Sequence, residues 1–202
     1  MPGRTELEPL PLRWQTPPEW AERILRYPLD LLADHAHLEH KAAVSAMYVM
    51  SHWPDREGIV ERMAAIAREE LEHLVLVHRI LLARGGSLPH DHANPYVRGL
   101  QEHVRKGTDR HLLDRLLVSS LIEARSCERF ERLADAAEDV ELRDLYAGLC
   151  ASERGHHKSF LNFATREYPA DEALARWDEM LEIEAQLLAG LPFARRMHSG
   201  VQ

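Results

Sequence analysis

The chain repeats one pattern of glutamate and histidine, and this repeat restricts the fold more than any other feature of its 202 residues. A lone glutamate is followed by a Glu-x-x-His motif, 31 residues later in the first copy and 30 residues later in the second. The copies are offset by 84 positions for the lone glutamates and 83 for the motifs, which indicates a duplicated helix hairpin. Each motif places both of its side chains on one helix face. The six residues are Glu39, Glu70, His73, Glu123, Glu153 and His156.

Each of the four glutamates falls on the apolar face of its predicted helix, where a charged side chain is unexpected. Glu39, for example, shares a face with Leu32, Ala36 and Ala43. A buried, unpaired carboxylate is costly or is forced to take up a proton, and two divalent cations would neutralise four of them. The pattern therefore predicts a four-helix bundle in which two lone glutamates and two Glu-x-x-His motifs bind two metal ions.

The composition predicts an all-α chain that forms one domain over residues 1–202. Glycine occurs only 10 times, and no long stretch alternates apolar with polar residues. Neither Cys127 nor Cys150 belongs to a Cys-x-x-Cys pair, which favours the reducing cytoplasm over a disulfide framework. No apolar stretch is long enough to span a membrane, so we expect no membrane contact. The net charge of −8 argues against broad affinity for nucleic acid but leaves a local basic face open.

Helix-start and helix-stop signals divide the chain into predicted elements. Thr16 resembles the cap of a short first helix, Asp55 the cap of the second long helix, and Asp139 the cap of the fourth. We expect the tail either to pack across the bundle or to be mobile. The predicted elements are an extended arm (1–15), helices over 17–26, 28–51, 56–84, 95–106 (in a crossover), 109–137, 139–167 and 171–190, and a tail (191–202).

Two alternatives compete with this assignment of the metal ligands. The glutamates could instead pair with Arg68, Arg125 or Arg129 in a polar core. His157 competes with His156, but only His156 reproduces the spacing of the first motif. Other glutamates lie off the apolar faces and are expected in solvent or in ion pairs, namely Glu69, Glu72, Glu128 and Glu131.

Carboxylate-rich ligation with imidazole suits iron or manganese better than copper or zinc. We expect two iron ions per chain, dioxygen as co-substrate and an external electron-donating reductase. This chemistry alone does not separate a hydroxylase from a ferroxidase, a peroxidase or a manganese catalase. Side chains expected to orient the ligands through hydrogen bonds are Arg125, Ser126 and His35.

Several segments of the chain resemble the bacterial tRNA hydroxylases that act on 2-methylthio-N6-isopentenyladenosine, which are ferritin-like di-iron proteins. The Glu-Ala-Arg-Ser-Cys-Glu-Arg motif is the most specific, since a generic ferritin-like protein has no reason to carry it. Gly155 departs from the alanine expected there, at a helix-propensity cost of about 1 kcal/mol, and leaves the ligand spacing intact. The segments are His37–Ala43, Arg68–His73, Ile122–Phe130, Ser152–His156 and His198–Gly200.

The resemblance implies oxygen-dependent hydroxylation of the isopentenyl side chain of the adenosine next to the anticodon (adenosine 37), with the six repeated residues as iron ligands. The modified base would enter a pocket while basic residues hold phosphates of the anticodon loop. Candidates for those contacts, which ordinary solvated surface charge would explain equally well, are Arg98, Arg105, Lys106, Arg110, Arg195 and Arg196.

Two further functions stay open on the sequence. One is a ferritin-like ferroxidase, peroxidase or other di-metal oxidoreductase that does not act on RNA. The other is a metal-free helical interaction module. The specific motif and the long crossover argue against the first. Metal analysis of the purified protein decides the second, because about two iron ions per chain are incompatible with a metal-free module.

Overall fold

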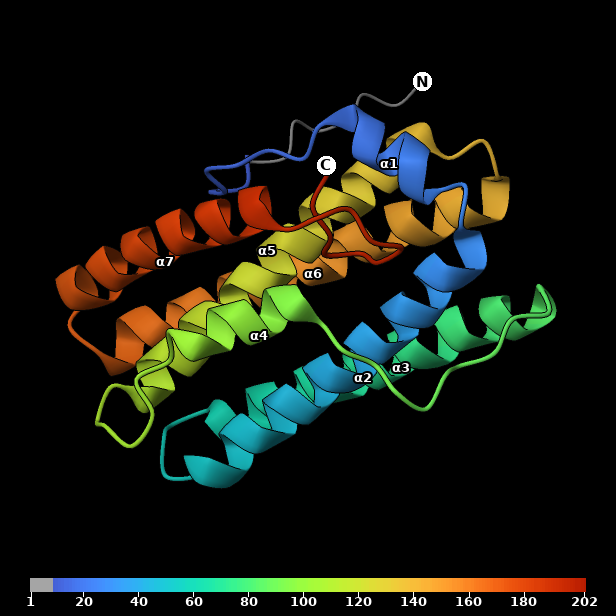
Figure 1. Cartoon of the computed structure of the whole chain (residues 1–202). Helices are drawn as coiled ribbons and strands as arrows, with labels where there is room; N and C mark the ends of the chain where they lie inside the picture. Colours follow the sequence, from blue (N-terminus) through green and yellow to red (C-terminus); the bar gives the residue numbers. More distant parts are fainter. Residues whose placement is uncertain (1–8) are drawn as a thin grey trace, which may run out of the picture.

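The structure is a computed structural model that describes residues 9–202, and the regular elements in that range are all α-helices (Figure 1). This confirms the predicted all-α fold class. Residues 9–15 of the predicted arm carry no helix, and residues 1–8 lie outside the described range. The helices are α1 (Pro18–Ile24), α2 (Pro28–His52), α3 (Ile59–Ala83), α4 (Pro95–Glu102), α5 (His111–Ala136), α6 (Val140–Glu167) and α7 (Ala170–Gly190).

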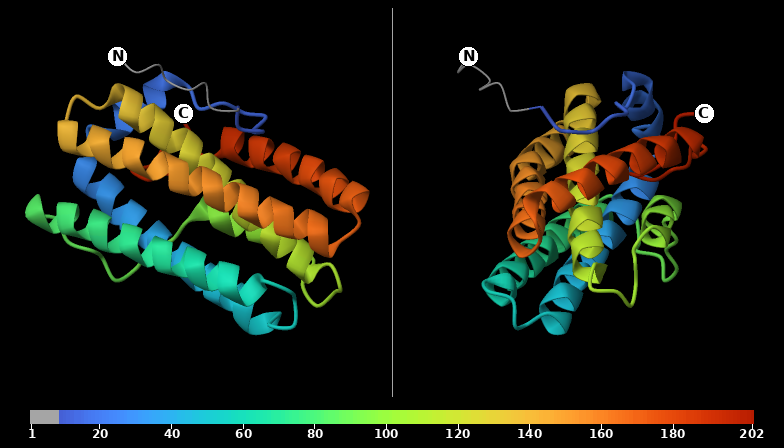
Figure 2. Two further views of the ribbon diagram at one scale, coloured as in Figure 1. Left: turned by 180° about the vertical axis from the view of Figure 1, so that it is seen from behind. Right: turned by 90° about the vertical axis from the view of Figure 1, so that its left-hand side faces the viewer.

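Two antiparallel helix hairpins form the bundle. Helix α2 packs along α3, and α5 packs along α6, as Figure 2 shows. The connection from α3 to α5 crosses the bundle and carries α4, while α7 lies against α5 and α6 (Figure 2). This is the four-helix arrangement with a long crossover that the repeat predicts. No helix within residues 9–202 is long and apolar enough to cross a membrane.

The buried apolar side chains form two clusters rather than one continuous core. In α3, Ile66 belongs to one cluster and Val77 to the other, and Glu70 lies between them in the sequence. In α6 the order is reversed around Glu153, with Leu149 of the second cluster before it and Phe160 of the first cluster after it. A layer of charged side chains therefore interrupts the core at mid-length of the bundle.

Two predicted helix caps are wrong. Helix α3 begins at Ile59 rather than near residue 56, because Gly58 precedes it with a left-handed φ of 71° that a residue with a side chain rarely adopts. Asp55 therefore lies before the helix start. Thr16 does not cap α1, since its hydroxyl donates to the Glu128 carboxylate over 2.5 Å. A hydrogen bond to a residue distant in the sequence has taken the place of the predicted capping hydrogen bond.

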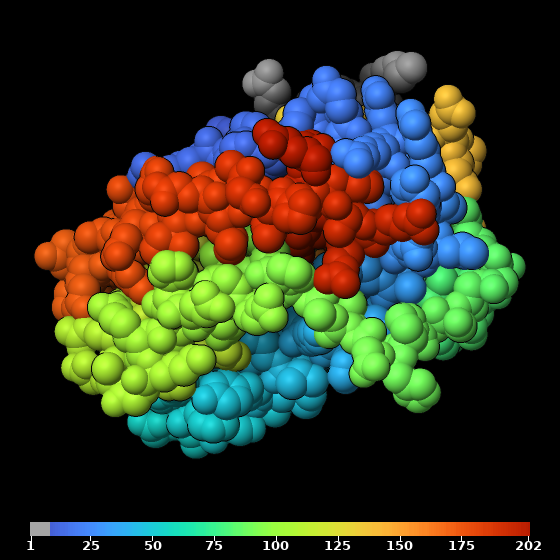
Figure 3. Space-filling model, viewed as in Figure 1, coloured from blue at the N-terminus to red at the C-terminus, as the bar shows by residue number. Residues whose placement is uncertain are grey.

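The C-terminal segment after α7 packs against the bundle. Residues 197–200 are buried, and the indole Nε1 of Trp20 donates to the Ser199 hydroxyl over 3.1 Å. The guanidinium of Arg129 donates to the Ser199 carbonyl over 2.9 Å. Figure 3 shows this segment, in red, lying between α7 and the first turns of α2. Of the two behaviours expected of the tail, packing against the bundle is confirmed.

Replacing Gly200 with alanine is expected to undock this segment. A Cβ at position 200 would overlap the backbone carbonyl of Leu191, which cannot move aside as a flexible side chain can. We expect the free energy of unfolding to fall by about 1–3 kcal/mol in urea titrations, with a red shift of tryptophan fluorescence as Trp20 is exposed. Gly148→Ala is the control, because that exposed glycine in α6 has no atom within 4 Å of the added Cβ. Equal stability of both variants would contradict the prediction.

Candidate metal centre

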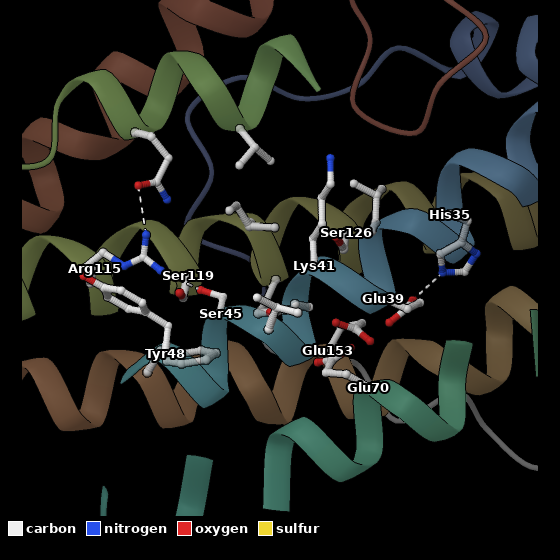
Figure 4. A pocket seen from close by; sticks show the side chains of 18 of the residues that line it. His35, Glu39, Lys41, Ser45, Tyr48, Glu70, Arg115, Ser119, Ser126 and Glu153 are labelled. Carbon is white, nitrogen blue, oxygen red and sulfur yellow. Dashed lines mark hydrogen bonds and ion pairs between the residues drawn. The ribbon is translucent and has the colours of Figure 1, made fainter. Parts of the chain in front are cut away.

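Helices α2, α3, α5 and α6 bring the six repeated residues together at the interrupted core. They form two groups, in each of which one ligand atom per residue lies within 4.8 Å of the others. Glu70 and Glu153 belong to both groups, which places them between two positions for an ion. Figure 4 shows Glu39, Glu70 and Glu153 pointing toward one another. The first group is Glu39, Glu70, His73 and Glu153, and the second is Glu70, Glu123, Glu153 and His156.

The two histidines each face more than one carboxylate. His73 Nδ1 lies 3.4 Å from Glu153 Oε1 and 3.7 Å from Glu70 Oε2. His156 Nδ1 lies 2.7 Å from Glu70 Oε1 and 3.9 Å from Glu153 Oε2. His157, the competing histidine, points elsewhere and lies 2.8 Å from the Ser120 hydroxyl. The structure therefore brings His156 rather than His157 to the cluster.

Several polar atoms of the cluster are buried and form no hydrogen bond of normal geometry with the described residues, although some lie close to one another. They include both carboxylate oxygens of Glu70, Oε1 of Glu153, and Nδ1 of His73 and of His156. Buried polar atoms are nearly always satisfied in proteins, so this converging set of unsatisfied oxygen and nitrogen atoms fits the binding of cations. The donor set of carboxylate oxygens and imidazole nitrogens fits iron or manganese.

The pKa shifts of the cluster residues reflect an excess of negative charge among them. Burial raises the pKa of Glu70, and burial together with the charge of Glu153 raises the pKa of Glu123 well above its usual range. Burial acts to lower the pKa of His73, but the neighbouring carboxylates, first that of Glu153, raise it to about 12. The pKa of His156 rises to about 9 against the effect of burial, through the Glu70 carboxylate. Protons thus gather where cations would sit, and metal binding would displace them.

Two contacts orient the cluster from outside. His35 Nε2 lies 2.5 Å from Glu39 Oε1, where the sequence predicted an orienting histidine. His156 Nε2 lies 2.8 Å from Glu69 Oε2, a carboxylate–histidine contact of the kind that fixes the tautomer of a ligand histidine. This contact of Glu69 is not predicted from the sequence, which places Glu69 in solvent or in an ion pair. No local signal reveals it, because the two residues lie on different helices.

The other two predicted orienting residues lie nearby in different roles. Ser126 lines the cavity described below, and its hydroxyl lies 3.2 Å from His198 Nε2. Arg125 pairs with Glu184 and Glu128 rather than with a candidate ligand.

The arginines that could have neutralised the cluster are engaged elsewhere. Arg68 faces Glu72, and Arg125 is held in the buried pairs just described. The guanidinium of Arg129 lies 3.9 Å above the Trp20 ring. None of these contacts supplies a positive charge to the four glutamates, which favours the metal alternative over the arginine alternative.

A cavity of about 270 Å³ leads to the cluster between α2, α4 and α5 (Figure 4). Much of its wall is apolar, with Leu38, Ile122 and Phe160 among the lining residues. The exposed residues Lys41 and Val44 belong to the same wall, so the cavity reaches the surface. Its inner end includes the four glutamates. An elongated molecule with an apolar end could therefore place that end beside the metal positions.

Four of the six basic residues predicted to contact RNA have partners in the structure. Arg98 and Lys106 are exposed and have no ion pair within residues 9–202. The partners of the other four are Asp114 for Arg105, Asp109 and Glu172 for Arg110, Asp30 for Arg195, and the Ala93 carbonyl for Arg196.

A bundle of four long helices that gathers four buried glutamates and two histidines into two overlapping groups belongs to the ferritin-like carboxylate class. The family described as tRNA-(MS[2]IO[6]A)-hydroxylase (MiaE) matches residues 7–199, and the chain belongs to this family. This confirms the resemblance found in the sequence.

Individual relatives agree with that membership. The chain is 36% identical over 187 residues to a Pseudomonas putida protein named tRNA 2-(methylsulfanyl)-N(6)-isopentenyladenosine(37) hydroxylase, covering 92% of this chain and 90% of the relative. A Salmonella typhimurium protein of the same name is 32% identical over 162 residues, which span 80% of this chain and 59% of that relative. A solved structure, a Synechococcus protein with aldehyde deformylating oxygenase activity, superposes with a TM-score of 0.89 at 36% identity, covering 94% of this chain and 96% of that one.

Proposed function

We propose that this protein is an oxygen-dependent di-iron hydroxylase that acts on the isopentenyl group of 2-methylthio-N6-isopentenyladenosine beside the anticodon of tRNA. The observation that carries the proposal is the buried Glu/His cluster at the inner end of a largely apolar cavity. Membership of the hydroxylase family supports the choice of substrate.

The six repeated residues would hold two iron ions, with Glu70 and Glu153 shared between them. When bound, a ferrous pair supplies electrons to dioxygen and so allows a C–H bond to be hydroxylated. In the net reaction one oxygen atom enters the C–H bond as a hydroxyl group and the other leaves as water. Two electrons come from an external reductase and two protons from the solvent. The cytoplasm, where thiols such as Cys127 and Cys150 stay reduced, is the compartment we propose.

The chain's own residues position the substrate and the ligands. The apolar wall around Ile122 and Phe160 would hold the isopentenyl group and exclude water from the reacting carbon. His35 and Glu69 would keep Glu39 and His156 in their orientations through the hydrogen bonds described above. The substrate would thus be placed with its alkyl end toward the shared carboxylates.

The test is hydroxylation by the purified, iron-loaded protein of a tRNA that carries the isopentenyl modification. We expect nucleoside mass analysis to show the modified adenosine gaining one oxygen atom, which comes from labelled dioxygen and not from labelled water. Omission of the reductant or of oxygen serves as the control. A product without the label, or no product with a fully iron-loaded protein, would contradict the proposal.

One comparison favours a second candidate function. The Synechococcus protein has aldehyde deformylating oxygenase activity, and an apolar cavity would also accept an alkyl aldehyde. The cavity of this chain, however, also has Lys41, Gln101 and Arg115 in its wall, and an alkyl chain makes no use of such groups. Conversion of a long-chain aldehyde to alkane and formate, without hydroxylation of tRNA, would favour the second function.

A further inference from the structure

Arg115 on α5 forms part of the cavity wall at a distance from the metal positions (Figure 4). It precedes Glu123 by eight residues on the same helix, which is about 12 Å at 1.5 Å per residue. Its guanidinium donates to Gln101 Oε1 over 3.0 Å and to the Ser45 hydroxyl over 3.1 Å. It also lies 4.7 Å from the centre of the Tyr48 ring. Three helices thus hold this side chain in one place.

No carboxylate within residues 9–202 forms an ion pair with Arg115. Its Nε is buried and has no acceptor in that range, and burial lowers the pKa of the side chain. Other arginines of α5 are paired, Arg125 with Glu184 and Glu128, for example. A partly buried guanidinium that lacks an anion bears a desolvation cost, which an anionic ligand would offset.

The proposed substrate would bring an anion toward Arg115 when its alkyl end lies at the glutamates. A prenylated nucleotide carries its reactive alkyl group at one end and its phosphates at the other, beyond the purine and the ribose. With the alkyl end at the glutamates, the phosphate end lies toward the part of the cavity that Arg115 lines. A guanidinium is suited to phosphate because its N–H groups match two phosphate oxygens.

We propose that Arg115 binds a phosphate group that flanks the modified nucleotide, and so holds the isopentenyl end at the metal centre; this inference rests on the proposed function. Lys41 is the other cation of the cavity wall, but its ammonium group is already hydrogen-bonded to the ring and the carbonyl of His92. Arg98 lies outside the cavity lining. Arg115 is therefore the cation best placed to receive the phosphate.

The test measures how tightly a synthetic anticodon stem-loop RNA with the modified adenosine binds to wild-type protein and to Arg115→Gln, by fluorescence anisotropy over a range of salt concentrations. We expect Arg115→Gln to weaken binding about 10-fold at fixed salt. The slope of log affinity against log salt should shrink by about 0.7, the contribution of one phosphate on a single strand. Arg115→Lys should keep most of this slope, because the charge is retained.

Arg143→Gln is the matched control. It removes the same charge from the same hairpin, near the start of α6 and at the end far from Arg115. Within residues 9–202, Arg143 pairs only with its exposed neighbour Asp144. Its salt slope should equal that of the wild-type protein. Equal slopes for Arg115→Gln and wild type would overturn the proposal.

A second readout separates phosphate binding from a purely structural brace between α2, α4 and α5. The free modified nucleoside and its 3′,5′-bisphosphate are compared as inhibitors of stem-loop hydroxylation. Wild-type protein should bind the bisphosphate more tightly, and Arg115→Gln should bind both compounds alike. If Arg115→Gln instead weakens both compounds equally and lowers the melting temperature, the residue is a brace and the proposal fails. A wild-type protein that binds no stem-loop RNA would overturn the proposed function along with this inference.

Discussion

Glu70→Gln is expected to remove both metal ions and, with them, all measurable hydroxylation. Glu70 belongs to both groups of the Glu/His cluster, so the loss of its negative charge should weaken both proposed metal positions at once. Replacing a group that merely orients a ligand already costs about 10- to 100-fold in metal affinity, and loss of a shared ligand should cost more. Metal analysis by mass spectrometry should show iron falling from about two ions per chain to near zero.

The control for this prediction is His73→Gln. His73 belongs to only one of the two groups, so this variant should keep one ion more tightly than the other. Equal metal loss in the two variants would contradict the shared position of Glu70. Glu153→Gln should behave like Glu70→Gln, since Glu153 is the other shared residue.

Glu70→Gln should also make the metal-free protein more stable. Both oxygens of the Glu70 carboxyl group are buried and form no hydrogen bond of normal geometry within residues 9–202, and burial raises its pKa. A folded-state pKa above the ordinary value of about 4.5 means that this group destabilises the fold once the pH exceeds that value. The gain from Glu70→Gln should therefore be absent near pH 4 and grow toward neutral pH. Calorimetry of the metal-free proteins measures this gain as a rise in melting temperature, which is about 2–4 °C per kcal/mol for a chain of this size.

Glu184→Ala is expected to give the largest loss of stability among single substitutions outside the metal centre. Glu184 and Arg125 are both 0% exposed, and Arg125 donates to the two carboxylate oxygens over 2.8 and 3.0 Å. With Glu128 and Arg129, they form a buried set of two negative and two positive side chains. Glu184→Ala leaves two buried cations with one anion, a loss that costs about 3–5 kcal/mol when a buried pair is broken.

Urea titration of the metal-free protein measures this effect. Glu182→Ala provides the control on the same helix, because Glu182 pairs with Arg13 at the exposed surface over 3.2 Å. Exposed pairs contribute about 0–1 kcal/mol, so this variant should be close to wild type. Replacing Arg125 and Glu184 together with methionine should recover much of the loss, since no unpaired charge is then buried. Similar losses for Glu184→Ala and Glu182→Ala would contradict the buried charge set.

The family relationship and the ligand cluster are the parts of this protein that could be predicted from residues alone. Helix periodicity places Glu70 and His73 on one face, and the second copy of the pattern selects His156 over its neighbour. These features depend on spacing within one helix, or on comparison of two similar segments. The helix ranges could be predicted for the same reason, to within a few residues.

Helix ends and tail contacts depended on partners distant in the sequence. Thr16 has the form of a cap, yet its hydroxyl bonds to Glu128, 112 residues away. Ser199 receives a hydrogen bond from Trp20, 179 residues away. No local pattern encodes such pairs, because they form only when the hairpins, α1 and the tail have packed.

By itself, the sequence determined the bundle, the hairpin duplication and the six residues that face one another across it, because the helical repeat and the cost of buried charge act within each segment. Only the tertiary structure decided that Glu69 contacts His156, that Glu184 of α7 neutralises Arg125, and that Arg115 stands in the cavity wall with no carboxylate partner from residues 9–202. Each of these depends on how helices pack, and packing determines which charges find a partner.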